Sequence, residues 1–478
     1  MNFSADKKEI SRFIDLFFEN TKLENCLIAL KRFTIKINDD FLDKRADFIK
    51  SEVQKDTYFD SIFHKLSKIC NDEKQECEIC PVHKYCNTYI RNCRESVKED
   101  SLKMIDLFCG AGGLSLGFTQ EGFVSSLAND IQECCVDTYA HNHPETPRSK
   151  IILGDVKDVA DNIENLVDVT SIDIIVGGPP CQGFSMANRQ RLIDDPRNQL
   201  YKSYVEIVRK VRPKFFVMEN VKGMLSVAEQ VKEDFYAAGY SVECHVLNAK
   251  DYGVPQNRER LIYIGNRLGI DNETVFKEIF DLSKKIPQHV LKDALFGLRP
   301  LEASRNKMST ELENTQSGFA IEKNAEHKTN EYIDYINQNR LMDFVCNHKA
   351  RYNNDRDIEI YRRMQQGDKS DDPKIADIMP YARRNGIFKD KYYKLVESNV
   401  CKTITAHMKF DCNMYIHPYQ ARGLTPREAA RVQGFPDDYL FLGSPNEWYR
   451  QIGNAVSPLM ARVLASGLKL VLERIYRG

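Results

Sequence analysis

The sequence predicts an α/β protein with a parallel, doubly wound sheet, a smaller second lobe and a mostly helical N-terminal region. Short β-rich apolar runs alternate with helical patterns from Lys103 onward, which is typical of a parallel sheet with helices on both faces. This rhythm ends near Asn266, and no regular pattern returns before about Tyr419. Residues 1–100 differ from both parts, because they combine six cysteines with helical patterns.

The first five apolar runs and a later one are expected to form the strands. A crossover helix is expected where apolar residues recur at helical spacing from Leu200 to Val211, and the C-terminal LMARVLASGLKLVLERI should pack on the sheet. We expect domains at 1–100, 101–267, 268–421 and 422–478, the last completing the sheet domain. The runs end at Phe108, Asp130, Asp155, Gly178 and Asn220, and the later strand covers Leu261–Gly265.

The composition indicates a soluble protein of a reducing compartment. The 478 residues suffice for roughly two to four domains, and 68 Lys or Arg balance 69 Asp or Glu. The N-terminal MNFSADKKEI is charged where a signal peptide is apolar, and no stretch approaches the ~18 apolar residues of a membrane span. We therefore expect a cytoplasmic protein without a membrane partner. Its 14 cysteines are then core residues, metal ligands or nucleophiles.

A glycine-rich turn, FCGAGG, joins the first expected strand to a helix. Gly110 and Gly112 let the backbone turn tightly and approach a ligand at the helix N-terminus. Asp130 closes the next strand 20 residues after Gly110, where a carboxylate can bond ribose hydroxyls. Asp155 closes the third strand in the same way. This combination favours an adenosine-containing ligand over a plain βα loop. Because GxxxxGK[ST] is absent, S-adenosylmethionine is favoured over ATP.

Four candidate catalytic residues follow the later strands. Cys181 comes directly after Gly-Gly-Pro-Pro, Glu219 ends the fifth strand, and QNRER places Arg258 and Arg260 before the last one. Strand alternation puts both arginines on one face, and parallel strand ends share one crevice. Each residue alone is more simply a core cysteine, a salt-bridge partner or a surface charge. Their combination indicates nucleophilic catalysis on an electron-poor ring.

Residues 103–475 resemble DNA (cytosine-5)-methyltransferases of the bacterial type. The matching motifs are DLFCGAGGLSLGF, GGPPCQGFS, MENV, QNRER, RGLTPREAARVQGFPD and QIGNAVSP, in the order usual for the family. The resemblance implies a Rossmann-like class I methyltransferase sheet, with a target-recognition domain between QNRER and RGLTPRE. It also implies that Cys181 attacks carbon-6 of a flipped-out cytosine while Glu219 bonds N3 and the amine. Arg260 would bond O2, and Arg258 would orient the loop or a phosphate.

The resemblance also assigns the residues that hold S-adenosylmethionine. Phe108 should stack near the adenine, Asp130 should bond the ribose, and Asp155 should face the adenine amine. Pro180 and Leu200 would line the pocket, and Asn454 with Val456 would close it. Gly110 and Gly112 shape the turn beneath the ligand.

Double-stranded DNA is the expected partner. Residues Ile378–Phe410 contain seven Lys or Arg interleaved with Tyr and Phe, a pattern that suits phosphates and bases as well as it suits a solvated face. We expect the modification enzyme of a restriction-modification system, with a cognate restriction endonuclease and a monomeric state. Two rival hypotheses are a tRNA cytosine-5 methyltransferase and a catalytically silent DNA-binding module.

Four N-terminal cysteines have metal-ligand spacing. Cys70, Cys77, Cys80 and Cys86 form C-x6-C-x2-C-x5-C, and four thiolates suit zinc or an iron-sulfur cluster. Zinc sites usually contain two CxxC pairs, whereas this spacing has one. The loop resembles the 4Fe-4S loop of endonuclease III-like glycosylases over about 25 residues, without their catalytic motifs. A structural 4Fe-4S cluster is therefore favoured over zinc.

Overall fold

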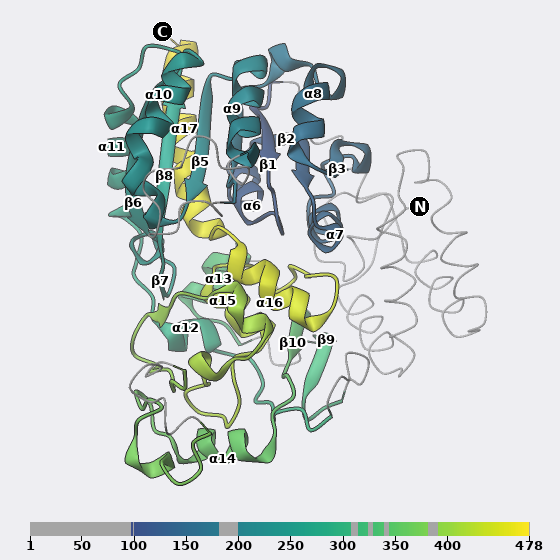
Figure 1. Ribbon diagram of the computed structural model, residues 1–478, viewed down its shortest axis with the longest axis vertical. Coiled ribbons are helices and arrows are strands. Elements are labelled where there is room, and N and C mark those ends of the chain that lie inside the picture. Colours follow the sequence, from purple (N-terminus) through teal and green to yellow (C-terminus); the bar gives the residue numbers. More distant parts are fainter. Residues whose placement is uncertain are drawn as a thin grey trace, which may run out of the picture.

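The computed structural model describes residues 97–98, 100–180, 199–306, 314–323, 328–338, 344–380 and 391–477. The predicted helical domain with its cysteine site, and the predicted nucleophile Cys181, lie outside the described residues. The description below therefore concerns the sheet domain and the lobe beneath it (Figure 1).

The described residues form a seven-stranded sheet in the order β3-β2-β1-β4-β5-β8-β6. Strands β1 to β5 pair in parallel, as predicted, whereas β8 runs antiparallel to both β5 and β6. The prediction of an all-parallel sheet is therefore wrong, and the sheet is mixed. The strands are β1 (Lys103–Leu107), β2 (Val124–Asp130), β3 (Ile151–Leu153), β4 (Ile174–Gly177), β5 (Phe215–Asn220), β6 (Ser241–Asn248) and β8 (Glu259–Asn266).

The mixed topology follows from the lengths of the connections. A full crossover helix, α10 (Ala228–Ala237), joins β5 to β6, so these two strands point the same way. Only a short turn and the two-residue strand β7 (Gln256–Asn257) separate β6 from β8, and such a connection returns the chain antiparallel. Strand β8 then inserts between β5 and β6. Strand β6 was not predicted, because most of its residues are only partly buried and its sequence is not a continuous apolar run.

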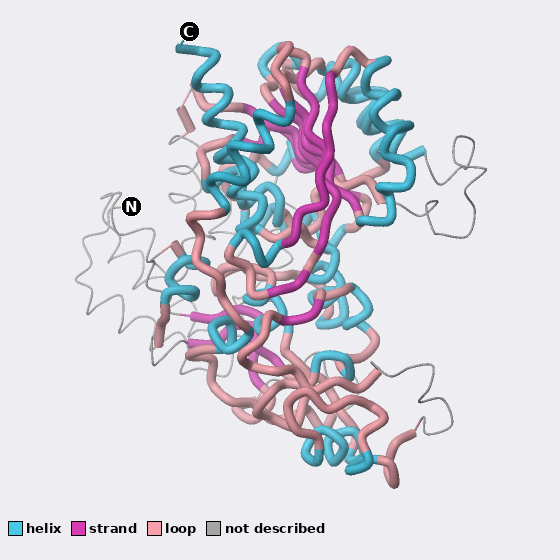
Figure 2. Tube along the Cα trace, turned by 90° about the vertical axis from the view of Figure 1, so that its left-hand side faces the viewer, coloured by secondary structure: helices cyan, strands magenta, loops and turns pink. Residues whose placement is uncertain are grey.

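Helices cover both faces of the sheet (Figure 2). On one face, α8, α9 and α10 pack on the strands through one hydrophobic cluster, and on the other α6, α11 and α17 do so through a second. The predicted crossover helix and the packing of the C-terminal helix are confirmed. Helix α11 extends this layer past the predicted boundary at residue 267. The bounds are α6 (Gly113–Gln120), α7 (Glu133–Asn142), α8 (Val156–Leu166), α9 (Gln199–Val211), α11 (Asn272–Ser283) and α17 (Pro458–Arg477).

The C-terminal helices are apolar because they are core elements. By length and composition, the stretch Pro445–Ile475 would be long and apolar enough to cross a membrane, but 72% of its most apolar window is buried inside the protein. Helix α17 places Met460, Leu464 and Leu468 in the cluster beneath the sheet with no exposed surface.

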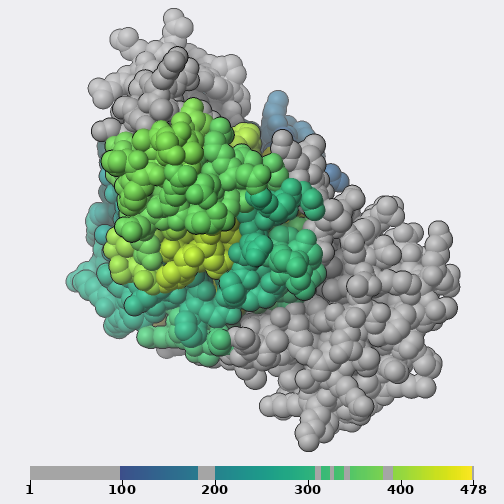
Figure 3. All heavy atoms as spheres, turned by 90° about the horizontal axis from the view of Figure 1, so that it is seen from below, coloured from purple at the N-terminus to yellow at the C-terminus, as the bar shows by residue number. Residues whose placement is uncertain are grey.

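The lower lobe consists of short elements around an antiparallel pair of strands, β9 and β10. Strand β11 pairs in parallel with β7 and so connects the lobe to the sheet domain. Seen from below, yellow-green residues lie between green and teal residues of the lobe (Figure 3). The elements are α12 (Leu291–Leu295), β9 (Gly318–Lys323), α13 (Glu331–Asn337), β10 (Phe344–Lys349), α14 (Asp355–Arg363), β11 (Cys401–Lys402), α15 (Pro426–Val432) and α16 (Pro445–Asn454).

Short 3-10 helices fill several connections. They cover Arg148–Lys150, Val169–Ser171, Lys222–Val227, Ala249–Tyr252, Pro373–Ile375, Ala406–Lys409 and Asn413–Tyr415.

Helix α15, from the RGLTPREAARVQGFPD motif, is buried on all sides and fixes the lobe through charged side chains. Arg422 makes a two-pronged ion pair with Glu428 at 2.7 and 2.8 Å, and Arg431 makes one with Asp437 at 2.6 and 2.7 Å. Arg427 donates instead to the backbone carbonyls of Cys346, Pro436 and Tyr439. A buried guanidinium is tolerated only when its donors are bonded in this way.

We expect Arg431→Ala to lower the free energy of unfolding by about 3–5 kcal/mol, because it leaves the buried Asp437 carboxylate without its counter-charge. Urea denaturation measures the loss. The matched control is Arg209→Ala, which breaks an exposed pair with Glu206 and should leave the unfolding midpoint unchanged. Equal midpoints for the two variants would contradict the structural role of the Arg431 pair.

Candidate active site

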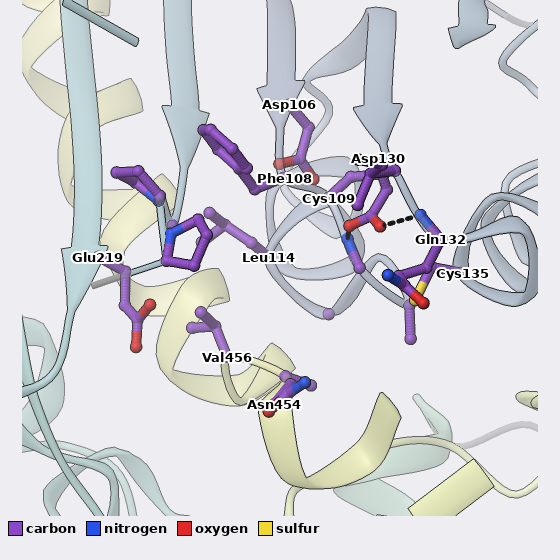
Figure 4. A pocket seen from close by; sticks show the side chains of 18 of the residues that line it. Asp106, Phe108, Cys109, Leu114, Asp130, Gln132, Cys135, Glu219, Asn454 and Val456 are labelled. Atoms are coloured by element: carbon purple, nitrogen blue, oxygen red, sulfur yellow. Dashed lines mark hydrogen bonds between the residues drawn. The ribbon is translucent and has the colours of Figure 1, made fainter. Parts of the chain in front are cut away.

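A pocket of about 640 Å³ lies at the carboxyl ends of β1, β2, β4 and β5, and the end of α16 closes it from below (Figure 4). Ten of the predicted site residues line it, although they come from segments up to several hundred residues apart. This is the crevice expected at the strand ends of a doubly wound sheet. The ten are Phe108, Gly110, Asp130, Asp155, Pro180, Leu200, Glu219, Arg260, Asn454 and Val456.

The glycine-rich turn is shaped by left-handed backbone at three positions: Phe108 has φ 57°, Gly110 has φ 53° and Gly112 has φ 84°. Gly112 caps the N-terminus of α6 instead of lining the pocket. A Cβ there would come within 2.6 Å of His143 Nε2, so only glycine fits. Left-handed backbone at a non-glycine residue such as Phe108 costs free energy, and such strained residues cluster at ligand-binding and active sites.

Asp130 holds this turn in place. One carboxylate oxygen accepts from the Gly110 amide at 2.9 Å, and the other accepts from the Gln132 amide at 2.8 Å (Figure 4). Burial raises the pKa of Asp130. Each oxygen keeps one lone pair, so the carboxylate can still accept hydroxyl donors from a ligand.

A second carboxylate, which sequence reasoning missed, lies deeper in the pocket. Asp106 is only 1% exposed. Its Oδ2 accepts from Ser115 Oγ at 2.6 Å, and its Oδ1 has no hydrogen-bond partner among the described residues. Burial raises the pKa of Asp106 to about 7. The sequence offers one signal that could have identified Asp106: its carboxylate lies inside the apolar run MIDLF, and buried acids are rare without a partner.

Glu219 and Arg260 form an ion pair at the pocket wall. Arg260 Nε lies 2.7 Å from Glu219 Oε1. Gly178 leaves the space for this carboxylate, because a Cβ there would lie 2.8 Å from Glu219 Oε2. The neighbouring Asn220, also missed in the sequence, donates to the Pro179 carbonyl at 3.0 Å. It thereby fixes the backbone that leads through Pro180 to Cys181.

Arg258 does not share the pocket wall with Arg260. It lies between β7 and β8, so strand alternation does not extend to it. The side chain is 1% exposed and donates to the carbonyls of Ile404, Gly453 and Ala455 at 2.7 to 3.1 Å. Burial lowers its pKa. This arrangement leaves Arg258 inaccessible to a phosphate and makes it a brace for the end of α16.

Residues 102–469 match the family described as C-5 cytosine-specific DNA methylase. The chain belongs to this family of DNA methyltransferases. It is 33% identical over 386 residues to the type II methyltransferase M1.HphI of Haemophilus parahaemolyticus, covering 77% of this chain and 87% of that protein. It is 32% identical over 440 residues to the type II methyltransferase M.AgeI of Thalassovita gelatinovora, covering 78% of this chain and 100% of that protein.

A solved structure supports the same assignment of this methylase. A prophage-encoded protein of Escherichia coli, assigned as a DNA modification methyltransferase, is 27% identical. It superposes with a TM-score of 0.59 and covers 78% of this chain and 100% of its own.

S-adenosylmethionine is the cofactor expected for a C-5 cytosine methylase, and the pocket residues fit it. The partnerless Asp106 oxygen suits an ammonium group, and Asp130 suits ribose hydroxyls. Other lining residues that sequence reasoning missed include Cys109, Ile131, Gln132, Cys135 and Arg450. In the part of the chain that the structure describes, no group of three or more His, Cys, Asp or Glu could hold a metal. The four N-terminal cysteines lie outside that part.

We expect the affinity of this methylase for S-adenosylmethionine to fall as the pH is lowered from 7.5 to 6. The pKa of Asp106 is about 7, so acidification neutralises the carboxylate, whereas an α-amino group stays protonated below its pKa of ~7.7 to 8. The loss approaches about tenfold per pH unit below the pKa. Calorimetric titration at several pH values measures it.

The matched variant is Asp106→Asn, which should bind the cofactor more weakly at pH 7.5 and show little change between pH 7.5 and 6. An unaltered pH profile in this variant would mean that another group is responsible.

Proposed function

We propose that this methylase transfers a methyl group from S-adenosylmethionine to carbon-5 of a flipped-out cytosine in a specific duplex DNA sequence, through a covalent adduct with Cys181. The observation that carries the proposal is the Glu219–Arg260 ion pair in the wall of the cofactor pocket. After the neighbouring strand β4, Pro179 and Pro180 line the same pocket and lead in sequence directly to Cys181. A carboxyl group and a cation thus lie in the pocket wall, and the segment that leads in sequence to Cys181 lines the same pocket.

The catalytic residues divide the work as follows. Cys181 thiolate attacks carbon-6 of the ring, Glu219 bonds N3 and the exocyclic amine, and Arg260 bonds O2. The electron pair thereby moves to carbon-5, where the bound cofactor supplies the methyl group. A base then removes the carbon-5 proton, and the returning electron pair expels Cys181. Because carbon-6 is shielded within a base stack, the cytosine must leave the helix, at a cost of a few kcal/mol.

The remaining predicted residues hold the cofactor or the backbone. We assign Phe108 to the adenine face, Asp130 to the ribose and Asp155 to the adenine amine. Pro180 and Leu200 form one wall, and Asn454 and Val456 form the opposite one. Gly110 and Gly112 shape the turn, and Arg258 is a positioning residue. On this assignment residues 101–267 and 422–478 carry cofactor binding and catalysis, and residues 268–421 carry target recognition.

The cellular role that we propose is protection of DNA in a bacterial restriction-modification system. The similar proteins M1.HphI and M.AgeI are both named type II methyltransferases, which supports this role. It implies a cognate restriction endonuclease as partner and a cytoplasmic, nucleoid-associated location. We propose that the enzyme acts as a monomer.

We expect Cys181→Ser to lower methyl transfer to duplex DNA by about a thousandfold or more, because serine is a far weaker nucleophile at neutral pH. Cofactor affinity should stay within about twofold of wild type, since the cofactor pocket keeps its other lining residues. The control is Cys244→Ser on β6, outside the pocket lining, which should keep full activity. Retained turnover in Cys181→Ser would refute the covalent mechanism.

Methylome sequencing of DNA from cells that express the protein tests the substrate directly. The proposal predicts 5-methylcytosine at one recurrent sequence. Parallel assays with purified duplex DNA and tRNA separate it from its rivals. Methylation of tRNA alone would establish the RNA methyltransferase, and sequence-specific binding without methyl transfer to either substrate would establish the silent DNA-binding module.

We propose further that Cys70, Cys77, Cys80 and Cys86 hold a structural 4Fe-4S cluster. Their spacing and the single CxxC pair support iron over zinc. Anaerobic purification should give a brown protein with broad absorption near about 400 nm and matching amounts of iron and sulfide. Cys77→Ala should lose the iron, whereas Cys93→Ser, outside the motif, should keep it. A colourless protein loaded with zinc would refute the cluster.

A further inference from the structure

A short turn of the lower lobe, residues 405–410, lies directly against the wall of the cofactor pocket. Gly453 lines the pocket, and a Cβ on it would come within 2.2 Å of the Thr405 carbonyl carbon. On the other side, the carbonyl of Ile404 accepts from Arg258, two residues before the proposed catalytic Arg260. The turn is therefore held between the two segments that lead into the site.

The backbone of this turn is fixed. Met408 is completely buried. Arg351 donates to the Met408 carbonyl at 2.7 Å and to the Phe410 carbonyl at 2.8 Å. Its guanidinium also lies 5.7 Å from the centre of the Tyr449 ring on α16. The arginine thus connects the turn to the helix that closes the pocket.

Two side chains of the turn lie beside one exposed ring, that of Phe410. Phe410 is 64% exposed, the highest value among the exposed large hydrophobic residues in the described part of the chain. The Lys409 ammonium lies 4.7 Å from the centre of its ring, and the His407 ring centre lies 5.3 Å away. A single exposed apolar residue is ordinary. An exposed ring beside a cation, on a turn whose backbone is bonded and whose first residues contact Gly453 of the pocket wall, suits a partner with both anionic and apolar groups.

We infer that this turn reads the duplex beside the target cytosine, with Phe410 in apolar contact with a base edge and Lys409 on a backbone phosphate. The inference rests on the proposed function, since it names the DNA contacts of that same site. DNA provides phosphates for the cation, and its major groove exposes apolar base edges, above all the thymine methyl, which Phe side chains contact. The rigid backbone suits this role, because a base contact gives specificity only when the side chain is already in place.

Replacing Phe410 and replacing Lys409 should therefore have different effects on DNA binding and on base-pair discrimination. Loss of Phe410 removes a base contact, so discrimination should fall at one or two base pairs. Loss of Lys409 removes a phosphate contact, so binding should weaken equally on every sequence, and the salt dependence should fall by about one counterion.

The experiment measures methylation kinetics on the cognate duplex from methylome sequencing and on its single-base-pair variants. We expect Phe410→Ala to raise KM for the cognate duplex about tenfold and to reduce discrimination at the contacted position about tenfold, with kcat and cofactor affinity unchanged. Phe410→Leu should recover part of the discrimination. Lys409→Ala should raise KM uniformly, and the matched control Tyr236→Ala, an exposed ring on α10, should behave as wild type.

Wild-type KM and discrimination in Phe410→Ala, with an active wild-type enzyme, would overturn the inference and leave the proposed function intact. Loss of cofactor affinity in Phe410→Ala would also overturn it, because the residue would then act through the pocket. An unaltered KM together with a change of molecular mass on light scattering would assign the turn to contact between copies of the chain. A wild-type enzyme that methylates no duplex would instead refute the proposed function.

Discussion

The site depends on a buried network of polar side chains that joins two halves of the chain lying far apart in sequence. The strand ends supply one side of the pocket, and residues 450–456 supply the other. Gln433 of the α15 motif donates to the Ile452 carbonyl at 2.8 Å and accepts from Gln256 at 3.0 Å. Arg258 donates to Gly453. Buried donors without partners would cost several kcal/mol each, so these bonds define one position for the end of α16.

The same hydrogen-bond network connects the lower lobe to the segment that carries the proposed catalytic Arg260. Gln256 also accepts from the Ile404 amide at 2.7 Å, and Arg258 bonds the carbonyl of that residue. The strand pairing of β11 with β7 continues the connection. The backbone at Ile404, where the turn begins, is therefore held relative to the segment that leads to Arg260. On the proposed function, these bonds would hold the target-recognition residues in a set position relative to the catalytic ones.

The sequence predicted the strand ends and the pocket well, because apolar runs and glycine turns are local signals. It missed β6, whose residues are only partly buried, and the reversal of β8, which depends on the length of a connection instead of on any residue. It placed Arg258 at the pocket because alternation was carried across a break between two strands. Asp106 was overlooked because a residue within an apolar strand looks like part of the core. Its burial and its oxygen without a hydrogen-bond partner among the described residues distinguish Asp106 from the core residues around it, and both become known only from the structure.

The two pocket carboxylates illustrate how local bonding determines what a buried acid can do. Burial raises the pKa of Asp130, but the two backbone N–H bonds that it accepts oppose this rise and make the carboxylate part of the scaffold. Asp106 has one hydroxyl donor and a bare oxygen, so burial dominates and its pKa rises to about 7. An ammonium group placed against that oxygen would reverse the balance, because the opposite charge stabilises the carboxylate in a medium of low polarity. Binding a cation and ionising Asp106 are then one coupled step, and the free energy of burying the carboxylate is recovered only when a ligand of the right charge is present.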